Sequence, residues 1–256
     1  MKKRYYILIA ILSYLFFTLA NIPAAKVVTL LESNVSIPAK FYGVYGSLWN
    51  GGAEKVLIQG QPPVDQLQWS LNPASLLLAT LNADIKASIK EQNIIGNLSL
   101  SATGTFSASD IRARIDAGVM QELAQMPIGE LGGVFNINIE SMQLDADKLP
   151  IINADINWKN ATLTLVESVD LGHVNILIKP DDDDKLAATI TNKQGQLTLD
   201  GKTSVDNKKS YSVDLRITPE KNATDNIRQS LAMFSRRQTD GSYLLKRNGN
   251  LNEFGL

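Results

Sequence analysis

Strict alternation of apolar and polar residues is the feature that most constrains the fold of this 256-residue chain. Successive side chains of a strand point to opposite faces, so this pattern predicts strands with one buried face and one wet face. It runs through residues 111–115, 135–140, 152–158 and 211–217. Clusters of glycine, asparagine and aspartate separate such segments, as expected for turns. The sequence therefore predicts a mainly β fold, built as a long curved antiparallel meander.

Two segments replace this pattern with apolar residues spaced three and four apart, which is typical of helices. They cover residues 116–126 and 224–235. Each directly follows an alternating strand and precedes a glycine-led segment, and this shared order indicates an internal duplication. The proposed partners are Gly46 with Gly133, Trp69 with Trp158, Gly96 with Gly195, and Leu123 with Leu231.

The duplication predicts two repeats, each of four strands and a short helix. They would occupy residues 39–128 and 129–237, and residues 238–256 would add a closing strand. A single unit of this kind cannot bury its apolar face alone, so the repeats are expected to form one curved sheet. The helices would then cover one end or edge of that sheet.

The N-terminus carries an apolar run, Tyr5–Ile22, that contains no charge and follows Lys2, Lys3 and Arg4. About 18 helical residues rise roughly 27 Å, close to the hydrocarbon thickness of a bilayer. The basic cluster would keep the N-terminus in the cytoplasm and send the rest of the chain across the membrane. Residues 1–22 are therefore expected to be a cytoplasmic tip and transmembrane anchor. The residues assigned to this anchor are Tyr5, Leu8, Leu12, Leu15, Phe16 and Leu19.

A cleaved signal peptide is the alternative for this leader, because it has the same charged-then-apolar layout. Its cleavage site would be poor, since a cut after Ala25 places Pro23 where a small residue is needed. After the run, residues 23–38 are expected to form a stalk and linker, with a helix over 23–33 that starts at Pro23. Pro38 would end this segment before the strands begin.

The composition offers no chemistry for catalysis, and we expect no enzyme, cofactor or metal site. The chain has no cysteine and a single histidine, His173, which is expected to be a strand or turn residue rather than a base. A net charge of −1 gives no reason to expect nucleic acid. The acidic run 181–184 lacks the alternating ligand spacing of a calcium loop, and a solvated hairpin tip is the expected structure.

The three tryptophans are the most distinctive side chains. Trp49 stands between closely spaced glycines, where a bulge or tight turn is expected. Trp69 and Trp158 lie in the middle of alternating strands, so both are expected to fill the core on the concave side of the sheet. The alternative is an exposed apolar end that docks a partner, because tryptophan is enriched at binding hot spots.

Taken together, several motifs resemble type II secretion system protein N, also called the general secretion pathway protein N family. The first is Gly46-x-Leu48-Trp49-x-Gly51, followed by Trp69 and Pro73 in a second tryptophan strand. Weaker pieces are Asn192-x-x-Gly195 and Asp240-Gly241-x-Tyr243. The resemblance covers essentially the whole chain and extends distantly to AsmA-type envelope proteins, whose curved sheets form lipid grooves.

This resemblance implies a non-enzymatic, single-pass inner-membrane component of Gram-negative bacteria, with the bulk of the chain in the periplasm. Its expected partners are other type II secretion components, bound through a sheet edge or the tryptophan-bearing end, together with inner-membrane lipid. The alternative function is a lipid-binding or lipid-transfer groove lined by alternating apolar residues. No small-molecule ligand other than lipid is expected.

Overall fold

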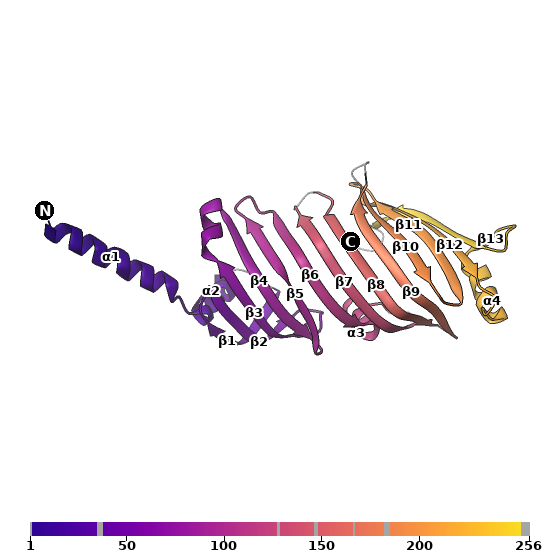
Figure 1. Ribbon diagram of the computed structural model, residues 1–256, viewed down its shortest axis with the longest axis horizontal. Helices are drawn as coiled ribbons and strands as arrows, with labels where there is room; N and C mark the ends of the chain where they lie inside the picture. Colours follow the sequence, from indigo (N-terminus) through magenta and orange to yellow (C-terminus); the bar gives the residue numbers. More distant parts are fainter. Residues whose placement is uncertain are drawn as a thin grey trace. The chain divides into compact units, whose positions relative to one another are not determined.

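A computed structural model describes residues 2–34, 38–126, 129–145, 148–165, 167–181 and 185–251 (Figure 1). The chain divides into two compact units, Met1–Asn93 and Ile94–Leu256. The first unit holds α1 (Lys2–Ala20), α2 (Ala24–Asn34), β1 (Ala39–Gly46), β2 (Asn50–Ile58), β3 (Val64–Asn72), the 3₁₀ helix η1 (Pro73–Leu78) and β4 (Thr80–Ile89).

The second unit begins within β5 (Gln92–Ser101). Its further elements are β6 (Phe106–Asp116), α3 (Ala117–Leu123), β7 (Glu130–Leu144), β8 (Ile151–Thr164), β9 (Ser168–Pro180), β10 (Leu186–Lys193), β11 (Leu197–Val205), β12 (Ser210–Pro219), α4 (Asp225–Phe234), β13 (Arg236–Arg237) and β14 (Tyr243–Asn250).

Each unit is an antiparallel meander, which confirms the predicted mainly β class. In the first unit β1, β2, β3 and β4 pair in chain order. In the second unit the order is β5 to β12 in sequence, then β14 and finally β13. All four segments with predicted alternation lie in strands of this unit, namely β6, β7, β8 and β12.

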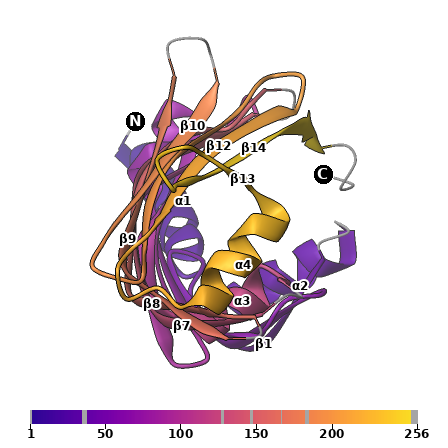
Figure 2. The same ribbon diagram turned by 90° about the vertical axis from the view of Figure 1, so that its right-hand side faces the viewer.

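The two predicted helices are present and begin at residues suited to helix starts. Asp116 precedes α3, and the Thr224 side chain accepts a hydrogen bond from the Ile227 amide at the start of α4. Figure 2 shows α3 and α4 on the inner side of the curved strands of the second unit. Both helices contribute to the core on this side, α3 through Ala117 and α4 through Ile227. The strands supply its other members, Phe135, Trp158, Ala161, Leu171, Val174, Leu197, Ile217 and Tyr243.

The strand count differs from the expected repeat. In the described residues six strands, not four, come before α3, and six more lie between α3 and α4. Strand β2 lacks regular alternation, because it begins with asparagine, two glycines and alanine. Trp69 lies on the third strand of the chain, whereas Trp158 lies on the second strand after α3. The duplication itself stays a prediction.

The N-terminal segment forms two helices, α1 and α2, separated at Asn21–Pro23. The predicted 23–33 helix corresponds to α2, which lies against β1: the Glu32 side chain accepts a hydrogen bond from the Phe41 amide at 3.0 Å. Among the described residues, none of the helices has both the length and the hydropathy required to cross a membrane. The side chains of Leu8, Leu12, Leu15 and Phe16 lie outside what the structure describes.

Candidate functional site

The residues Ser47–Trp49, here called the tryptophan loop, join β1 to β2 and connect them to the end of α1. The indole N–H of Trp49 donates to the Leu19 carbonyl at 2.8 Å. The Leu48 amide donates to the Ile22 carbonyl, also at 2.8 Å. Leu19 belongs to the last turn of α1, where carbonyls lack intrahelical partners, and Ile22 lies just beyond that turn. The loop therefore attaches the end of α1 to the first strand pair.

Strand β3 holds the same loop from its other side. The Trp69 indole N–H donates to the Leu48 carbonyl at 3.0 Å, and the Leu71 amide donates to the Trp49 carbonyl at 2.7 Å. Both Trp49 and Trp69 are half-buried, and each indole N–H is satisfied by the backbone of the chain. These two tryptophans are thus structural connectors of the first unit.

The glycines of the motif make this arrangement sterically possible. Gly46 has φ +78°, and its backbone pairs with that of Gly51 across a tight turn. A Cβ at Gly51 would come within 2.8 Å of the Trp69 ring. The predicted tight turn at Trp49 is therefore confirmed, and the Gly46-to-Trp69 motif forms one packed assembly.

Pro73 starts η1 at the same end of these strands. The Asn72 side chain accepts a hydrogen bond from the Ala74 amide at 3.0 Å, and the buried Ser75 hydroxyl donates to the Asn72 carbonyl at 2.7 Å. Proline suits this position because its missing N–H would have no partner in the first turn of a helix.

The later motif residues also serve turns. The Asn192 amide group donates to the Leu171 and Leu197 carbonyls, both at 2.7 Å, and its oxygen accepts from the Leu199 amide at 2.6 Å. Gly195 lies in the β10–β11 turn, where a Cβ would approach the Leu171 carbonyl carbon to 2.7 Å. The pair therefore fastens this turn to β9.

Asp240, Gly241 and Tyr243 form the turn into β14. The Asp240 carboxylate accepts hydrogen bonds from the Ser242 hydroxyl at 2.6 Å and from the Ser242 amide at 3.0 Å, and these bonds lower the pKa of Asp240. Gly241 has φ +84°, and Tyr243 is buried in the core. The turn sets the position at which β14 joins the sheet.

Trp158 is buried, as predicted for a core residue, with 8% of its surface exposed. Its ring stacks on Phe135 with 4.8 Å between centroids, and its N–H donates to the Gly132 carbonyl at 2.8 Å. The inner face around it is filled by the protein's own side chains together with α3 and α4.

The outer edge of β14 is the most exposed strand edge that the structure describes. Only Arg236 and Arg237 of β13 pair with it, opposite Leu244 and Tyr243. Along residues 245–249, no described strand covers this edge. The edge of β1 differs, because α2 lies beside it and Glu32 accepts from the Phe41 amide. Sheet edges are normally protected in this way, because unpaired backbone groups attract other strands.

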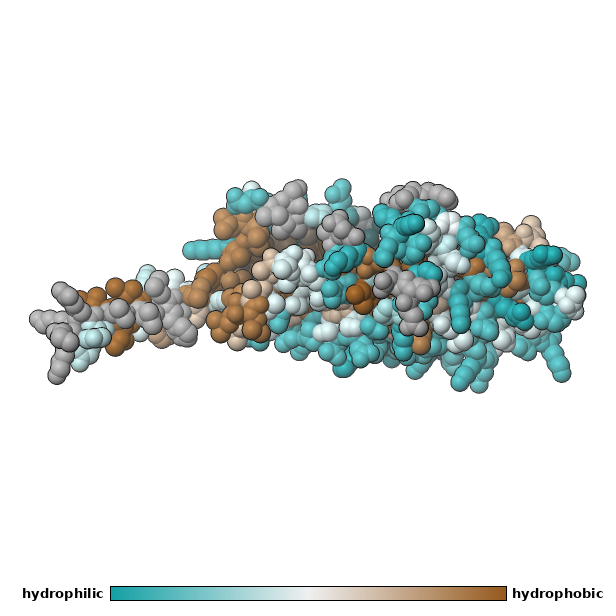
Figure 3. Space-filling model, turned by 90° about the horizontal axis from the view of Figure 1, so that it is seen from above, coloured by the Kyte–Doolittle hydropathy of each residue, from teal (hydrophilic) through white to brown (hydrophobic). Residues whose placement is uncertain are grey.

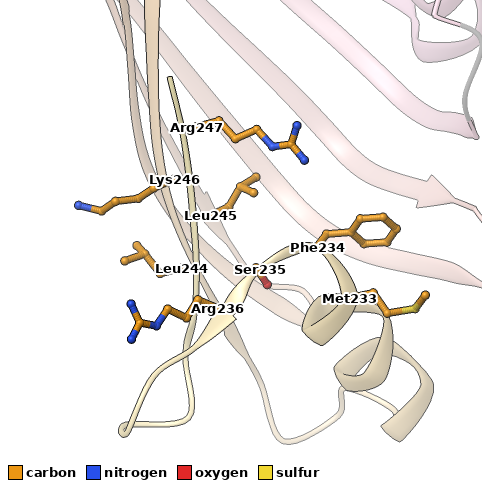
Figure 4. A pocket seen from close by; sticks show the side chains of 8 residues that line it. All are labelled: Met233, Phe234, Ser235, Arg236, Leu244, Leu245, Lys246 and Arg247. Carbon is orange, nitrogen blue, oxygen red and sulfur yellow. The ribbon is translucent and has the colours of Figure 1, made fainter. Parts of the chain in front are cut away.

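A hollow of about 490 Å³ lies along this edge (Figure 4). It is lined by Met233, Phe234, Ser235, Arg236, Leu244, Leu245, Lys246 and Arg247. Met233 and Phe234, at the end of α4, are 79% and 67% exposed. In Figure 4 Arg247 and Phe234 extend to the same side of β14, and Lys246 extends to the other. The hollow thus offers apolar surface and cations beside an open strand edge.

The charges of the edge are unbalanced. Lys246 pairs with Asp214 at 2.8 Å. Arg236, Arg237 and Arg247 form no ion pair with any part of the chain that the structure describes. An extended segment with carboxylate and apolar side chains would complement this surface. The sequence interpretation missed the site, although the basic pairs 236–237 and 246–247 were a visible signal.

The only histidine of the sequence, His173, lies in β9. His173 is exposed, and its Nδ1 accepts from the Asn160 amide at 3.4 Å. Within the described ranges, no cluster of histidine and carboxylate side chains is arranged to hold a metal ion. Asp182–Asp184 lie outside the described residues. Asp181 is described, and its amide donates to the Lys185 carbonyl at 2.7 Å in the β9–β10 hairpin.

The motif residues of this β protein build turns and strand connections, which is the arrangement of a structural component. The family model for type II secretion system protein N matches residues 39–246, so the chain belongs to that family. This is a family of secretion components and not a known family of enzymes. Neither the search of curated proteins nor the search of solved structures finds a match.

Proposed function

We propose that this protein is a non-enzymatic, periplasm-facing component of the type II secretion machinery that binds another secretion component at the outer edge of β14. Family membership supports the role in secretion. The open edge supports the mode of binding, because an extended segment can add to such an edge through backbone hydrogen bonds.

The contrast between the two outer edges carries this proposal. The β1 edge is covered by α2, whereas β13 covers only two residues of β14. Beside the uncovered part lie Arg236, Arg247 and the exposed ring of Phe234. The partner segment is therefore expected to be extended and to carry at least one carboxylate and one apolar side chain.

We also propose that α1 anchors the chain in the inner membrane. Its apolar run carries no charge, and Lys2, Lys3 and Arg4 precede it. Among its described side chains, Ile7, Ile9, Ile11 and Phe17 are exposed. Lipid would cover these side chains, and the basic cluster favours a cytoplasmic N-terminus with the strands in the periplasm.

Photo-crosslinking in secreting cells tests the binding site. A photoreactive residue at the exposed position Asn248 on β14 should give an adduct with a secretion component, identified by mass spectrometry. The same probe at Arg112, exposed on the interior strand β6, should not.

Charge reversal provides the matched comparison. The double change Arg236→Glu and Arg247→Glu should abolish the Asn248 adduct and reduce secretion. Lys202→Glu, which reverses an exposed cation on the interior strand β11, should preserve both. An Asn248 adduct unchanged by the double reversal, or no adduct in cells that secrete normally, would refute docking at this edge.

A further inference from the structure

Three consecutive leucines project from η1. Leu76, Leu77 and Leu78 are 50%, 89% and 79% exposed. Isolated apolar residues on a surface are ordinary, but a contiguous exposed group marks an interaction site.

The frame of η1 holds these leucines outward. Its first turn is capped by Asn72, and its last residues are closed by the Ala79 amide, which donates to the Leu76 carbonyl at 3.0 Å. The buried Ser75 connects both flanking strands: its hydroxyl donates to the Asn72 carbonyl and accepts from the Asn82 amide at 3.2 Å. The exposure of the leucines therefore belongs to an ordered turn.

The same end of the strands carries the junction with α1. Strand β3 runs back to the tryptophan loop, where Leu71 bonds to Trp49, and it enters η1 immediately afterwards. The loop in turn bonds to Leu19 and Ile22. Figure 3 shows hydrophobic residues gathered over this end of the first unit, beside α1.

The two segments that form the tryptophan loop and η1 at this end of the unit carry no charge. Residues 41–53, which contain the tryptophan loop, include no acidic or basic side chain, and residues 66–83, which contain η1, include none either. Approach to an apolar phase would therefore desolvate no ionised side chain of these segments, which is the largest cost such contact carries.

We propose that the η1 leucines insert into the periplasmic leaflet of the inner membrane beside α1. The occupant of this surface is the acyl-chain region of phospholipid, because the exposed leucines lie at the end of the strands to which the apolar helix α1 is attached. The inference rests on the proposed anchoring by α1, and it adds a second membrane contact that would limit tilting of the first unit on the bilayer.

The absence of cysteine from the chain permits a clean experiment. Leu77→Cys in the full-length protein would be labelled with an environment-sensitive NBD dye and reconstituted into vesicles of phosphatidylethanolamine and phosphatidylglycerol. The matched control is Gln61→Cys, an exposed position in the β2–β3 turn at the opposite end of the same strands. Circular dichroism would verify that both labelled proteins are folded.

The Leu77 probe should show blue-shifted emission and at least about twofold quenching by doxyl-labelled lipid, whereas the Gln61 probe should show neither. Equal, water-like emission from both probes on protein that floats with the vesicles would overturn the inference and leave the anchor intact. A blue shift at position 77 without doxyl quenching would place the leucines against protein and also overturn it. Protein that does not float would refute the anchor and this inference together.

Discussion

The indole nitrogen of Trp49 lies 2.8 Å from the carbonyl oxygen of Leu19, thirty positions earlier in the chain. This hydrogen bond joins the last turn of α1 to the loop between β1 and β2. A second bond runs from the Leu48 amide to the Ile22 carbonyl. The most distinctive sequence motif of the chain therefore attaches its N-terminal helix to the strands.

Trp49→Phe should loosen this fastening while leaving the strands intact. The change keeps most of the ring and removes the N–H donor, and the net value of one such bond is about 0.5–1.5 kcal/mol. Amide exchange at Leu48 in detergent-solubilised protein should accelerate by up to about tenfold. Tyr42→Phe on β1 is the control and should leave the Leu48 rate unchanged; equal rates in all three proteins would contradict the fastening role.

Gly46→Ala should destabilise the tryptophan loop by about 1–3 kcal/mol, because the residue has positive φ and the new Cβ would meet the Asn50 carbonyl oxygen at 2.5 Å. Gly104→Ala is the control for backbone strain alone, since Gly104 also has positive φ (+88°) but has open space where the new Cβ would lie. Urea unfolding followed at Trp49 and Trp69 should show the larger loss for Gly46. Equal losses would mean that the steric contact contributes nothing.

Trp158→Ala should lower the free energy of unfolding by about 3–5 kcal/mol, because it removes a buried ring and its stacking on Phe135. Trp69→Ala should cost less, since Trp69 is half-buried, whereas the sequence analysis placed both tryptophans in the core. Chemical denaturation of both variants gives the comparison. A loss below about 1 kcal/mol at Trp158 would contradict its place in the core.

The pKa of Asp240 should depend on Ser242. The Ser242 hydroxyl and amide both donate to this carboxylate and hold its pKa below the ordinary value of about 3.9. Ser242→Ala should raise the pKa of Asp240 toward that value in an NMR titration. Asp206, whose pKa is lowered by the Ser210 and Lys208 amides, is the internal control and should not move.

The lowered pKa makes the stabilising effect of Asp240 depend on pH. Because the folded-state pKa is depressed, the contribution of Asp240 is complete above its ordinary pKa and is lost as pH falls through the lowered one. The β13–β14 turn should therefore open earlier in acid for Ser242→Ala than for the original protein. Identical acid profiles would show that these bonds do not stabilise the turn.

The predicted strands and helices are confirmed where the spacing of apolar residues along the chain matches the buried face of the element. The alternation at 135–140 and 152–158 is the pattern of β7 and β8, and the spacing of Ile227 and Leu231 is that of α4. Strand number was underestimated in part because β2 begins with asparagine, two glycines and alanine, which leave no period to detect. The family motif was predictable as a turn, because close glycines have a local conformational meaning.

The sequence alone was sufficient to determine the β class, the tight turn at Trp49, the helix starts at Asp116 and Thr224, and the family. Only the tertiary structure decided that Trp49 contacts Leu19, that α2 lies beside β1 while no described strand covers residues 245–249 of β14, and that the exposed η1 leucines lie at the same end of the strands as the tryptophan loop. These relationships join segments that are distant in the chain. They follow from strand pairing and side-chain packing in three dimensions, for which no local pattern of residues carries a signal.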